Sequence, residues 1–368
     1  MRVSVIGGGV AGAASAIALR RATGAEVTVH EAYEDPAGQV GSFLSLAVNG
    51  LHGLDALGCL PEVQAAGFPV ALQRMWSASG KLLGEVPRGR RASDSLHSTT
   101  LLRGRLVEVL RAEAVRAGAR IETGRRVDPA DLDTDLVVAA DGIWSATRTA
   151  LDPSAPQVRY AGLYSVSGVS EGVRLTPGTY HFVFGRRGAF LCVPAADGTV
   201  WWSAQVPSPQ PPDPEEVTQG LLAELYGKEE LPLSLIRAAT RIDRPMPMHR
   251  LTDVPVWHDG RTVLIGDAAH PVGAGQGASM AIEDAVALAR CVSSVPGVAG
   301  ALAEYTRVRR PRVARMTRAA ATNRDSKTPG TMQRRVNDLL MPLAFRHVYA
   351  RSTSWLYSSE PGAGPGRA

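Results

Sequence analysis

The chain has 368 residues, of which 45% are hydrophobic and 20% charged, with a formal net charge of +5. This length allows two domains with buried cores, and the composition is typical of globular proteins. No apolar run approaches the roughly 20 residues that a membrane helix needs, so no membrane span is expected. Aromatic residues make up 5%, and basic residues near the C-terminus recur at helical spacing. A solvated helix face is therefore favoured over a nucleic-acid-binding surface.

The cysteines are three in number and far apart in the sequence: Cys59, Cys192 and Cys291. Their odd number argues against a disulfide framework, and their spacing matches no metal site. A strand is predicted directly after Met1, which leaves no room for a signal peptide. We therefore expect a cytoplasmic protein without a bound metal.

A Rossmann-like motif opens the chain. A predicted strand at residues 3–6 leads into a turn with the pattern G-x-G-x-x-G, and a helix and a second strand, Glu26–His30, follow. The glycines of the turn are Gly7, Gly9 and Gly12. Glu31 ends the second strand, where a carboxylate accepts hydrogen bonds from both ribose hydroxyls of a dinucleotide. An acid here argues against a 2′-phosphate, so the motif predicts a site for FAD or NAD.

A second glycine-rich loop lies between a predicted strand at residues 262–265 and a helix that begins at Ala278. Gly266 and Asp267 end the strand, and further glycines at 273, 275 and 277 allow close backbone approach to a ligand. The helix N-terminus offers free N–H groups to an anion or a carbonyl oxygen. Asp267 is placed to bind hydroxyls of a sugar or ribityl chain.

Two further positions lie where a strand passes into a helix. Asp141 and Gly142 end a buried strand, and Asp141 is a candidate to fix backbone amides of the first glycine loop. Arg148, in the short helix that follows, is a candidate for a phosphate or for the same loop. Arg103 opens another helix and is also within reach of a phosphate. The alternatives are a helix cap without a ligand for Asp141 and a solvent-exposed side chain for Arg103.

Strands dominate residues 157–206, which predicts an antiparallel sheet separate from the Rossmann unit. The fold class is therefore α/β (α+β), with a discontinuous dinucleotide-binding domain and an inserted sheet domain. We predict the dinucleotide-binding domain at 1–70, 98–156 and 242–325, the substrate-binding sheet domain at 71–97 and 157–241, a helical segment at 326–360 and a disordered tail at 361–368. We also predict a second strand pair at 120–127 and a helix from Pro214 to Tyr226.

The three motifs stand in a fixed order: the first glycine loop, Asp141-Gly142 with Ser145 and Arg148, and Gly266-Asp267 with His270. This set resembles the single-component FAD-dependent aromatic hydroxylases (class A flavoprotein monooxygenases), typified by para-hydroxybenzoate hydroxylase and salicylate hydroxylase. The resemblance covers nearly the whole chain and implies a Rossmann-like FAD-binding domain. That family has no separate NAD(P)H domain, so none is expected in this chain.

The resemblance also implies roles for individual residues. Around the adenosine and pyrophosphate parts of FAD it places Val10, Ala11, Gly12, Glu31 and Val127. Around the flavin and ribityl parts it places Arg103, Asp267 and the backbone from Gly275 through Gly277 to Ala278. It places Asp141 near the pyrophosphate and near a transient nicotinamide.

The substrate side departs from the hydroxybenzoate enzyme. Where that enzyme carries polar groups and an arginine, this chain has Val193, Ala195 and Ser203. An arginine would hold a carboxylate in a bidentate contact. Its absence predicts a less polar substrate without a benzoate-type carboxylate. Residues of a type able to act as a base are Tyr180, His181 and His249, but a structural role is favoured for each, so the catalytic residues are left unassigned.

The function predicted is that of a FAD-dependent monooxygenase that consumes NADH or NADPH. It would insert one oxygen atom from O2 into an apolar or aromatic small molecule by hydroxylation or epoxidation, in secondary metabolism or aromatic catabolism. The loop after His270 is shorter than usual in the family, which motivates one alternative, a flavin-dependent dehydrogenase or reductase of the same fold. A non-catalytic FAD-retaining partner protein is the other. The substrate, the choice between hydroxylation, epoxidation and Baeyer–Villiger oxidation, the choice of NADH or NADPH and the oligomeric state stay open.

Overall fold

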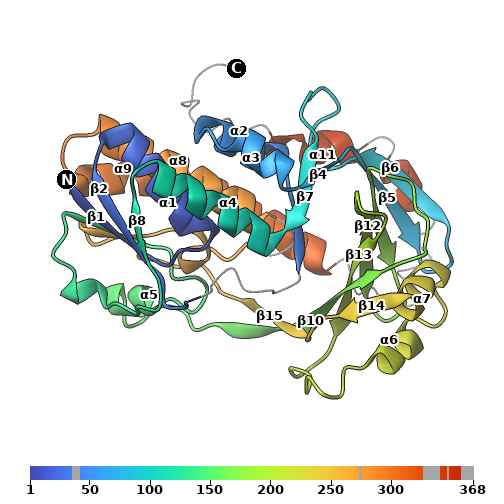
Figure 1. Cartoon of the computed structure of the whole chain (residues 1–368). Coiled ribbons are helices and arrows are strands. Elements are labelled where there is room, and N and C mark those ends of the chain that lie inside the picture. The colour runs from blue at the N-terminus through green and yellow to red at the C-terminus, as the bar shows by residue number, and fades with distance from the viewer. Residues whose placement is uncertain (35–41, 273–275, 326–339, 346–347, 358–368) are drawn as a thin grey trace.

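The computed structural model describes residues 1–34, 42–272, 276–325, 340–345 and 348–357. The predicted tail at 361–368 and the candidate Gly275 lie outside these residues. The molecule has two lobes, with a parallel sheet in one and a large, mainly antiparallel sheet in the other (Figure 1). The predicted α/β class is confirmed.

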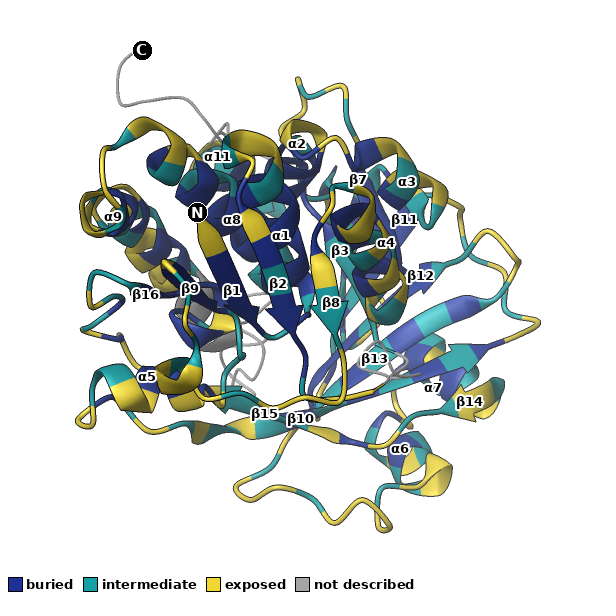
Figure 2. Ribbon diagram, turned by 60° about the vertical axis from the view of Figure 1, so that its left-hand side comes forward, coloured by how far each residue is buried: buried dark blue, intermediate teal, exposed yellow. Residues whose placement is uncertain are grey.

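The first lobe contains a five-stranded parallel sheet in the order β16-β9-β1-β2-β8. Its strands are β1 (Arg2–Ile6), β2 (Glu26–His30), β8 (Arg120–Glu122), β9 (Leu136–Ala139) and β16 (Thr262–Leu264). The central strands are almost wholly buried, as apolar runs in a parallel sheet require (Figure 2).

Helices cover this sheet and one another. The main ones are α1 (Val10–Thr23), α4 (Arg103–Arg116), α8 (Gly277–Ser294) and α9 (Val298–Asp325). Helix α1 packs on β1, β2 and β9, and α8 packs on α1 and α9. Pro311 lies inside α9, which continues past it as one helix. Two shorter helices, α2 (Val48–Ala56) and α3 (Leu60–Ala65), complete this lobe together with α5 (Ala146–Leu151).

A small antiparallel sheet in the order β3-β7-β4 joins the two lobes. Its strands are β3 (Phe43–Leu46), β4 (Phe68–Val70) and β7 (Ser98–Leu102). Strand β7 leads directly into α4, so Arg103 is the first residue of that helix.

The second lobe is built on eight strands in the order β14-β10-β13-β12-β11-β5-β6, with β15 paired to β10. They are β5 (Leu72–Ser77), β6 (Leu82–Pro87), β10 (Arg159–Ser170), β11 (Thr179–Phe184), β12 (Ala189–Pro194), β13 (Val200–Pro207), β14 (Ala239–Ile242) and β15 (Met246–Arg250). Helices α6 (Gln219–Leu225) and α7 (Glu230–Arg237) cover the face remote from the first lobe. The domain boundaries stay a prediction, although strand pairing joins residues 246–250 to this sheet.

Two local expectations were wrong. Within residues 120–127 only one strand forms, β8 at Arg120–Glu122, because the chain then leaves the sheet toward a 3-10 turn at Pro129–Asp131. The helix predicted from Pro214 begins only at Gln219, because the Thr218 hydroxyl caps it by accepting a hydrogen bond from Leu221 N. No helix among the described residues is long and apolar enough to cross a membrane. All three cysteines are buried and free.

Candidate FAD and substrate site

The first glycine loop combines close packing with one open position. A Cβ on Gly12 would lie 1.8 Å from the carbonyl oxygen of Gly7, so only glycine fits there. Gly7 has a φ of +94°, and its own Cβ would come 2.5 Å from the oxygen of Ala140 at the end of β9. A Cβ on Gly9, in contrast, would meet nothing within 4 Å. The backbone at Gly9 therefore faces open space in which another group fits.

Gly9 is also the N-cap residue of α1, and no side chain caps this helix. The N–H groups of the first turn, which contains Val10 and Ala11, are therefore free for a ligand. No acidic residue lies in that turn to repel an anion. This cradle suits a pyrophosphate at the positive end of the helix dipole.

Glu31 lies beside this loop and is already engaged within the protein. Its Oε2 accepts hydrogen bonds from Gly8 N at 2.8 Å and from Arg111 at 3.0 Å, and its Oε1 accepts one from Tyr33 N at 3.1 Å. Arg111 also donates from Nε to the Gly8 carbonyl at 2.7 Å. Contact between Glu31 and ribose stays a prediction. Sequence reasoning missed Arg111, since its partners lie 103 and 80 residues away.

The Gly266-Asp267 turn meets the first loop directly. It forms a 3-10 turn, Gly266–Ala268, and a Cβ on Gly266 would lie 2.9 Å from the Ala11 Cβ. The side chain of Asp267 is exposed, yet surrounding protein desolvates it and raises its pKa, an effect that His270 and Arg103 partly offset. The exposed side chain of Asp267 faces an opening between the Gly266-Asp267 turn and the start of α8 at Gly277, which we call the recess. Because Arg103 acts electrostatically on Asp267, the start of α4 lies near this carboxylate.

The second motif supports the third. One carboxylate oxygen of Asp141 accepts hydrogen bonds from Thr147, from its N at 3.1 Å and its hydroxyl at 2.9 Å, and the other carboxylate oxygen is buried without a partner. Asp141 thus bonds the first turn of α5, which Ser145 caps, rather than amides of the first loop, although a Cβ on Gly7 would lie 3.3 Å from the Asp141 Cα. Arg148 is buried and donates to the carbonyls of Ala268 at 3.0 Å and Ile143 at 2.8 Å. Its bonds tie α5 to the third motif.

The remaining cofactor candidates lie around this recess or at its edge. Gly277 begins α8, and its Cβ would lie 3.7 Å from Asp267 Oδ1, with Ala278 next in the same uncapped turn. Val127 is half-buried in the segment after β8, two residues beyond Arg125, whose N donates to the Glu31 carbonyl at 2.9 Å. The three glycine-containing turns therefore converge, as FAD binding requires.

Strands β10, β12 and β13 of the large sheet turn an uncharged face toward the first lobe. Strand register pairs Leu191 with Ser203 and Val193 with Trp201, so these four side chains share one face. Val193 and Trp201 pack there with Tyr180 and with apolar side chains of β3 and β4. The structure thus brings Val193 and Ser203 together. Ala195 lies outside this face, in the turn between β12 and β13, where its N donates to Thr199 O at 2.8 Å.

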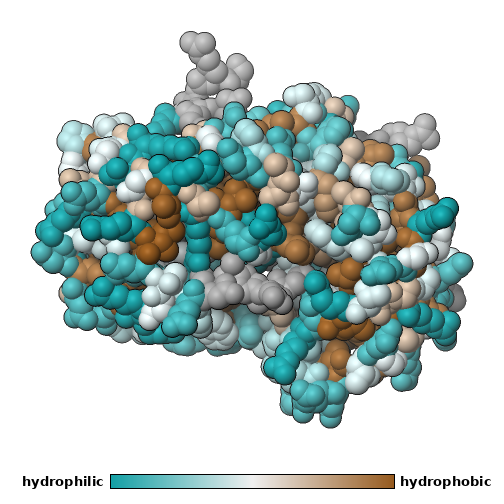
Figure 3. Space-filling view, viewed as in Figure 1, coloured by the Kyte–Doolittle hydropathy of each residue, from teal (hydrophilic) through white to brown (hydrophobic). Residues whose placement is uncertain are grey.

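Three further polar side chains of this face were missed from the sequence. Register pairs Ser167 with Ser203 and Ser165 with Gln205. Alternation within one strand gives no sign of which face a serine occupies, so only cross-strand pairing identifies them. In the paired parts of β10, β12 and β13 this face carries only uncharged residues. In the view of Figure 3, hydrophobic residues form several patches among hydrophilic ones on both lobes.

The three residues considered as a catalytic base lie in different parts of the second lobe. His181 lies on the opposite face, stacked on Trp76 at 6.0 Å, and its Nδ1 accepts a hydrogen bond from Trp76 Nε1 at 3.1 Å. Burial, with Arg74, lowers the His181 pKa to about 4. Tyr180 is buried on the face toward the first lobe, and burial raises its pKa. His249 packs against the exposed Trp144, with ring centroids 4.9 Å apart.

Comparison with known proteins decides the family. A model described as "FAD binding domain" matches residues 1–320. The chain is 32% identical over 331 residues to Aurachin C monooxygenase/isomerase of Stigmatella aurantiaca, covering 84% of this chain and 85% of that protein. It is 32% identical over 349 residues to 3-amino-4-hydroxybenzoate 2-monooxygenase of Streptomyces cremeus, covering 87% and 86%. The chain belongs to the FAD-dependent aromatic hydroxylases, the class A flavoprotein monooxygenases.

Solved structures show the same fold. Klebsiella pneumoniae HpxO complexed with FAD and uric acid has a TM-score of 0.82 and 23% identity, covering 97% of each chain. CtdE in complex with FAD and its substrate has a TM-score of 0.75 and 19% identity, again over 97% of each chain. The protein is thus a flavin-dependent monooxygenase with FAD as its cofactor, and the open cradle at Gly9 and the recess at Asp267 fit that cofactor.

Proposed function

We propose that this monooxygenase uses NADH or NADPH to insert one oxygen atom of O2 into a neutral aromatic or apolar small molecule. The observation that carries the proposal is the uncharged face formed by Leu191, Val193, Trp201 and Ser203 opposite the FAD-binding lobe. Several relatives are named for benzoate substrates. In the paired parts of β10, β12 and β13 this face carries no charged side chain, and Arg241 at its edge, opposite Val169, pairs with Asp243 at 3.2 Å, which supports a neutral substrate.

Arg88 borders this face and is already occupied. Its guanidinium lies 3.9 Å from the ring centroid of Tyr180, and it donates a hydrogen bond to Gln73 Oε1. A cation stacked on an aromatic ring is stabilised by the ring's negative face. Arg88 therefore has a structural explanation that needs no substrate carboxylate.

Different residues would contact different parts of FAD and of the substrate. The uncapped start of α1 would hold the pyrophosphate, with Glu31 at the ribose and Arg103 and Asp267 toward the flavin. Bound FAD supplies the redox chemistry, in which a reduced flavin activates O2 for transfer of one oxygen atom. The apolar side chains of the sheet would exclude water and orient the substrate, while the paired hydroxyls of Ser167 and Ser203 would hydrogen-bond its polar group. Asp141 would lie near the pyrophosphate and the transient nicotinamide.

The test uses purified protein and matched pairs of aromatic substrates with and without a carboxylate. We expect a yellow protein whose NADH or NADPH oxidation rises with the neutral member of a pair, and product that carries label from ¹⁸O₂. Labelled water is the control and should give unlabelled product. Unlabelled product from ¹⁸O₂ would exclude oxygen insertion, and a uniform preference for carboxylates would contradict the substrate class.

A further inference from the structure

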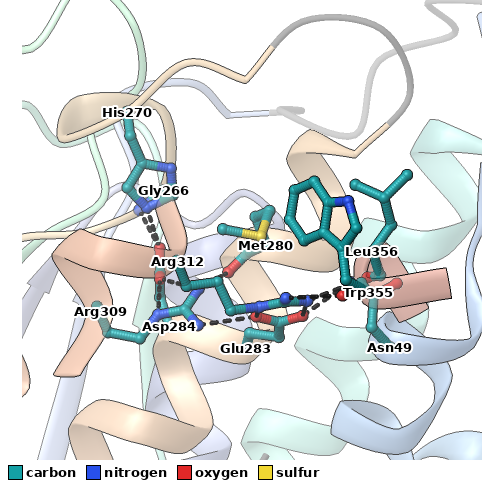
Figure 4. A network of polar contacts seen from close by, with 10 residues as sticks. All are labelled: Asn49, Gly266, His270, Met280, Glu283, Asp284, Arg309, Arg312, Trp355 and Leu356. Atoms are coloured by element: carbon teal, nitrogen blue, oxygen red, sulfur yellow. Dashed lines mark hydrogen bonds and ion pairs between the residues drawn. The ribbon is translucent and has the colours of Figure 1, made fainter. Parts of the chain in front are cut away.

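A buried network of charged side chains connects the Gly266-Asp267 turn with α8 and α9 (Figure 4). Asp284, in α8, is 0% exposed. Its Oδ2 accepts hydrogen bonds from Gly266 N at 2.9 Å and from His270 Nε2 at 2.6 Å. One carboxylate oxygen thus holds both ends of the segment 266–270. Asp267, the candidate FAD ligand, lies within that segment.

Asp284 is itself fixed by α9. Arg309 donates from Nε to Asp284 Oδ1 at 2.8 Å, so both carboxylate oxygens are engaged. Burial alone would raise the pKa of Asp284, but His270 and Arg309 outweigh it and lower the pKa to about 2. The group is therefore ionised at neutral pH. Hydrogen bonds to an ionised acceptor are roughly twice as strong as neutral ones, so the turn is held firmly.

The network continues from Asp284 to the C-terminal helix α11 (Tyr349–Tyr357). Arg309 also donates to Glu283 at 2.8 Å, and Arg312 donates to both oxygens of Glu283 at 2.7 Å. Arg312 in turn donates to the carbonyls of Trp355 at 3.4 Å and Leu356 at 3.1 Å. A continuous set of hydrogen bonds and ion pairs therefore runs from α11 to the FAD recess.

Stability alone gives a poor account of such a network. Buried ion pairs cost desolvation energy, and well-packed apolar residues often stabilise a protein as well or better. The network, however, fixes the position of the turn that carries Asp267, and so sets where Asp267 lies relative to Arg103 and the start of α1. A binding constellation needs its ligands held within about 0.5 Å by supporting hydrogen bonds.

We propose that Asp284 is a positioning residue for FAD, which presents Asp267 to the cofactor by holding Gly266 and His270 at the two ends of their turn. The proposal rests on the role assigned to Asp267 under the proposed function. Arg309 and Glu283 orient Asp284, and Arg312 extends this support to α11.

The experiment measures FAD binding to the FAD-stripped full-length protein by quenching of flavin fluorescence, together with the absorption spectrum of bound FAD. The variants are Asp284→Asn, which keeps the shape but removes the charge, and His270→Leu, which removes one of the two ties. Each should raise the FAD dissociation constant about tenfold or more, the loss expected when a charged hydrogen bond that orders a binding loop is removed. Each should also shift the flavin absorption bands.

The matched control is Glu113→Gln in α4, a carboxylate that is 3% exposed and pairs with Arg21 at 3.5 Å in a different part of the lobe. It should lower the Tm while leaving the FAD dissociation constant unchanged. If Asp284→Asn fails to fold, His270→Leu carries the same prediction. Variants that lose Tm like the control but bind FAD as tightly as wild type would overturn the positioning role. Wild-type protein that binds no FAD would instead overturn the cofactor assignment.

Discussion

The two lobes differ in what their side chains are required to do. In the FAD-binding lobe, positions such as Gly12 and Asp284 allow one residue type each, because a backbone oxygen or a buried charge network surrounds them. On the face of the large sheet that we propose for the substrate, Ser203 and Leu191 are only half-buried, and Leu191 packs against the apolar cluster of Tyr180 and Val193. The first lobe is constrained by a cofactor that the whole family shares, whereas the second is free to vary with the substrate.

The largest effect is expected at Gly12. Gly12→Ala places a Cβ 1.8 Å from the Gly7 carbonyl oxygen, which forces the turn to move. Such overpacking should cost about 3 kcal/mol of unfolding free energy or more. Gly9→Val is the matched variant, since a Cβ there meets nothing within 4 Å, so it should fold normally and lose FAD. Urea unfolding and FAD titration of both variants check this, and full FAD occupancy in Gly9→Val would contradict the cradle.

Asp267→Ala should be the next largest in effect. Removing a carboxylate that binds ligand hydroxyls should weaken FAD binding by about tenfold to a hundredfold. The control is Asp259→Ala in the turn before β16, where Asp259 Oδ1 accepts hydrogen bonds from Arg261 N at 2.9 Å and Thr262 N at 2.7 Å. That variant should lose stability and keep its FAD affinity. Equal FAD affinity in both variants would remove Asp267 from the site.

Two serines on opposite faces of the large sheet separate substrate binding from stability. Ser203→Ala should raise KM about tenfold, the loss of one hydrogen bond to substrate, with Tm unchanged. Ser170→Ala should lower the Tm and leave KM unchanged, because the Ser170 hydroxyl accepts a hydrogen bond from Trp202 Nε1 at 2.8 Å and donates one to Leu235 O at 2.6 Å in the core. Steady-state kinetics and thermal unfolding distinguish them. A Ser203→Ala enzyme with wild-type KM for its substrate would place the substrate elsewhere.

These contrasts explain what the sequence could predict. The glycine loops could be predicted because close backbone approach admits only glycine at Gly12, and such a requirement leaves a recognisable pattern in the amino-acid sequence. Arg111 and Ser167 were missed because their partners are brought close only by tertiary packing and strand register. The bonds of Asp141 and Arg148 were misjudged for the same reason: Thr147 and Ala268 compete for them once the chain folds.

The smallest expected effect is a pH dependence from His181. Its folded-state pKa of about 4 lies below the ordinary value of 6.5, so the unfolded chain binds a proton more readily. Stability is therefore full above pH 6.5 and is lost as the pH falls toward 4, by on the order of 1 kcal/mol at pH about 5.5. His181→Asn should lack this slope. Unfolding of both proteins between pH 7 and about 4.5 measures it, and parallel curves would contradict the burial argument.

The most direct test of the account is the structure of the protein with FAD bound. The account predicts a single FAD with its pyrophosphate against Gly9 and the start of α1, its ribityl chain at Asp267, and its flavin ring toward the face that carries Ser203. FAD bound away from the meeting point of these turns, or with its ring turned from that face, would contradict it.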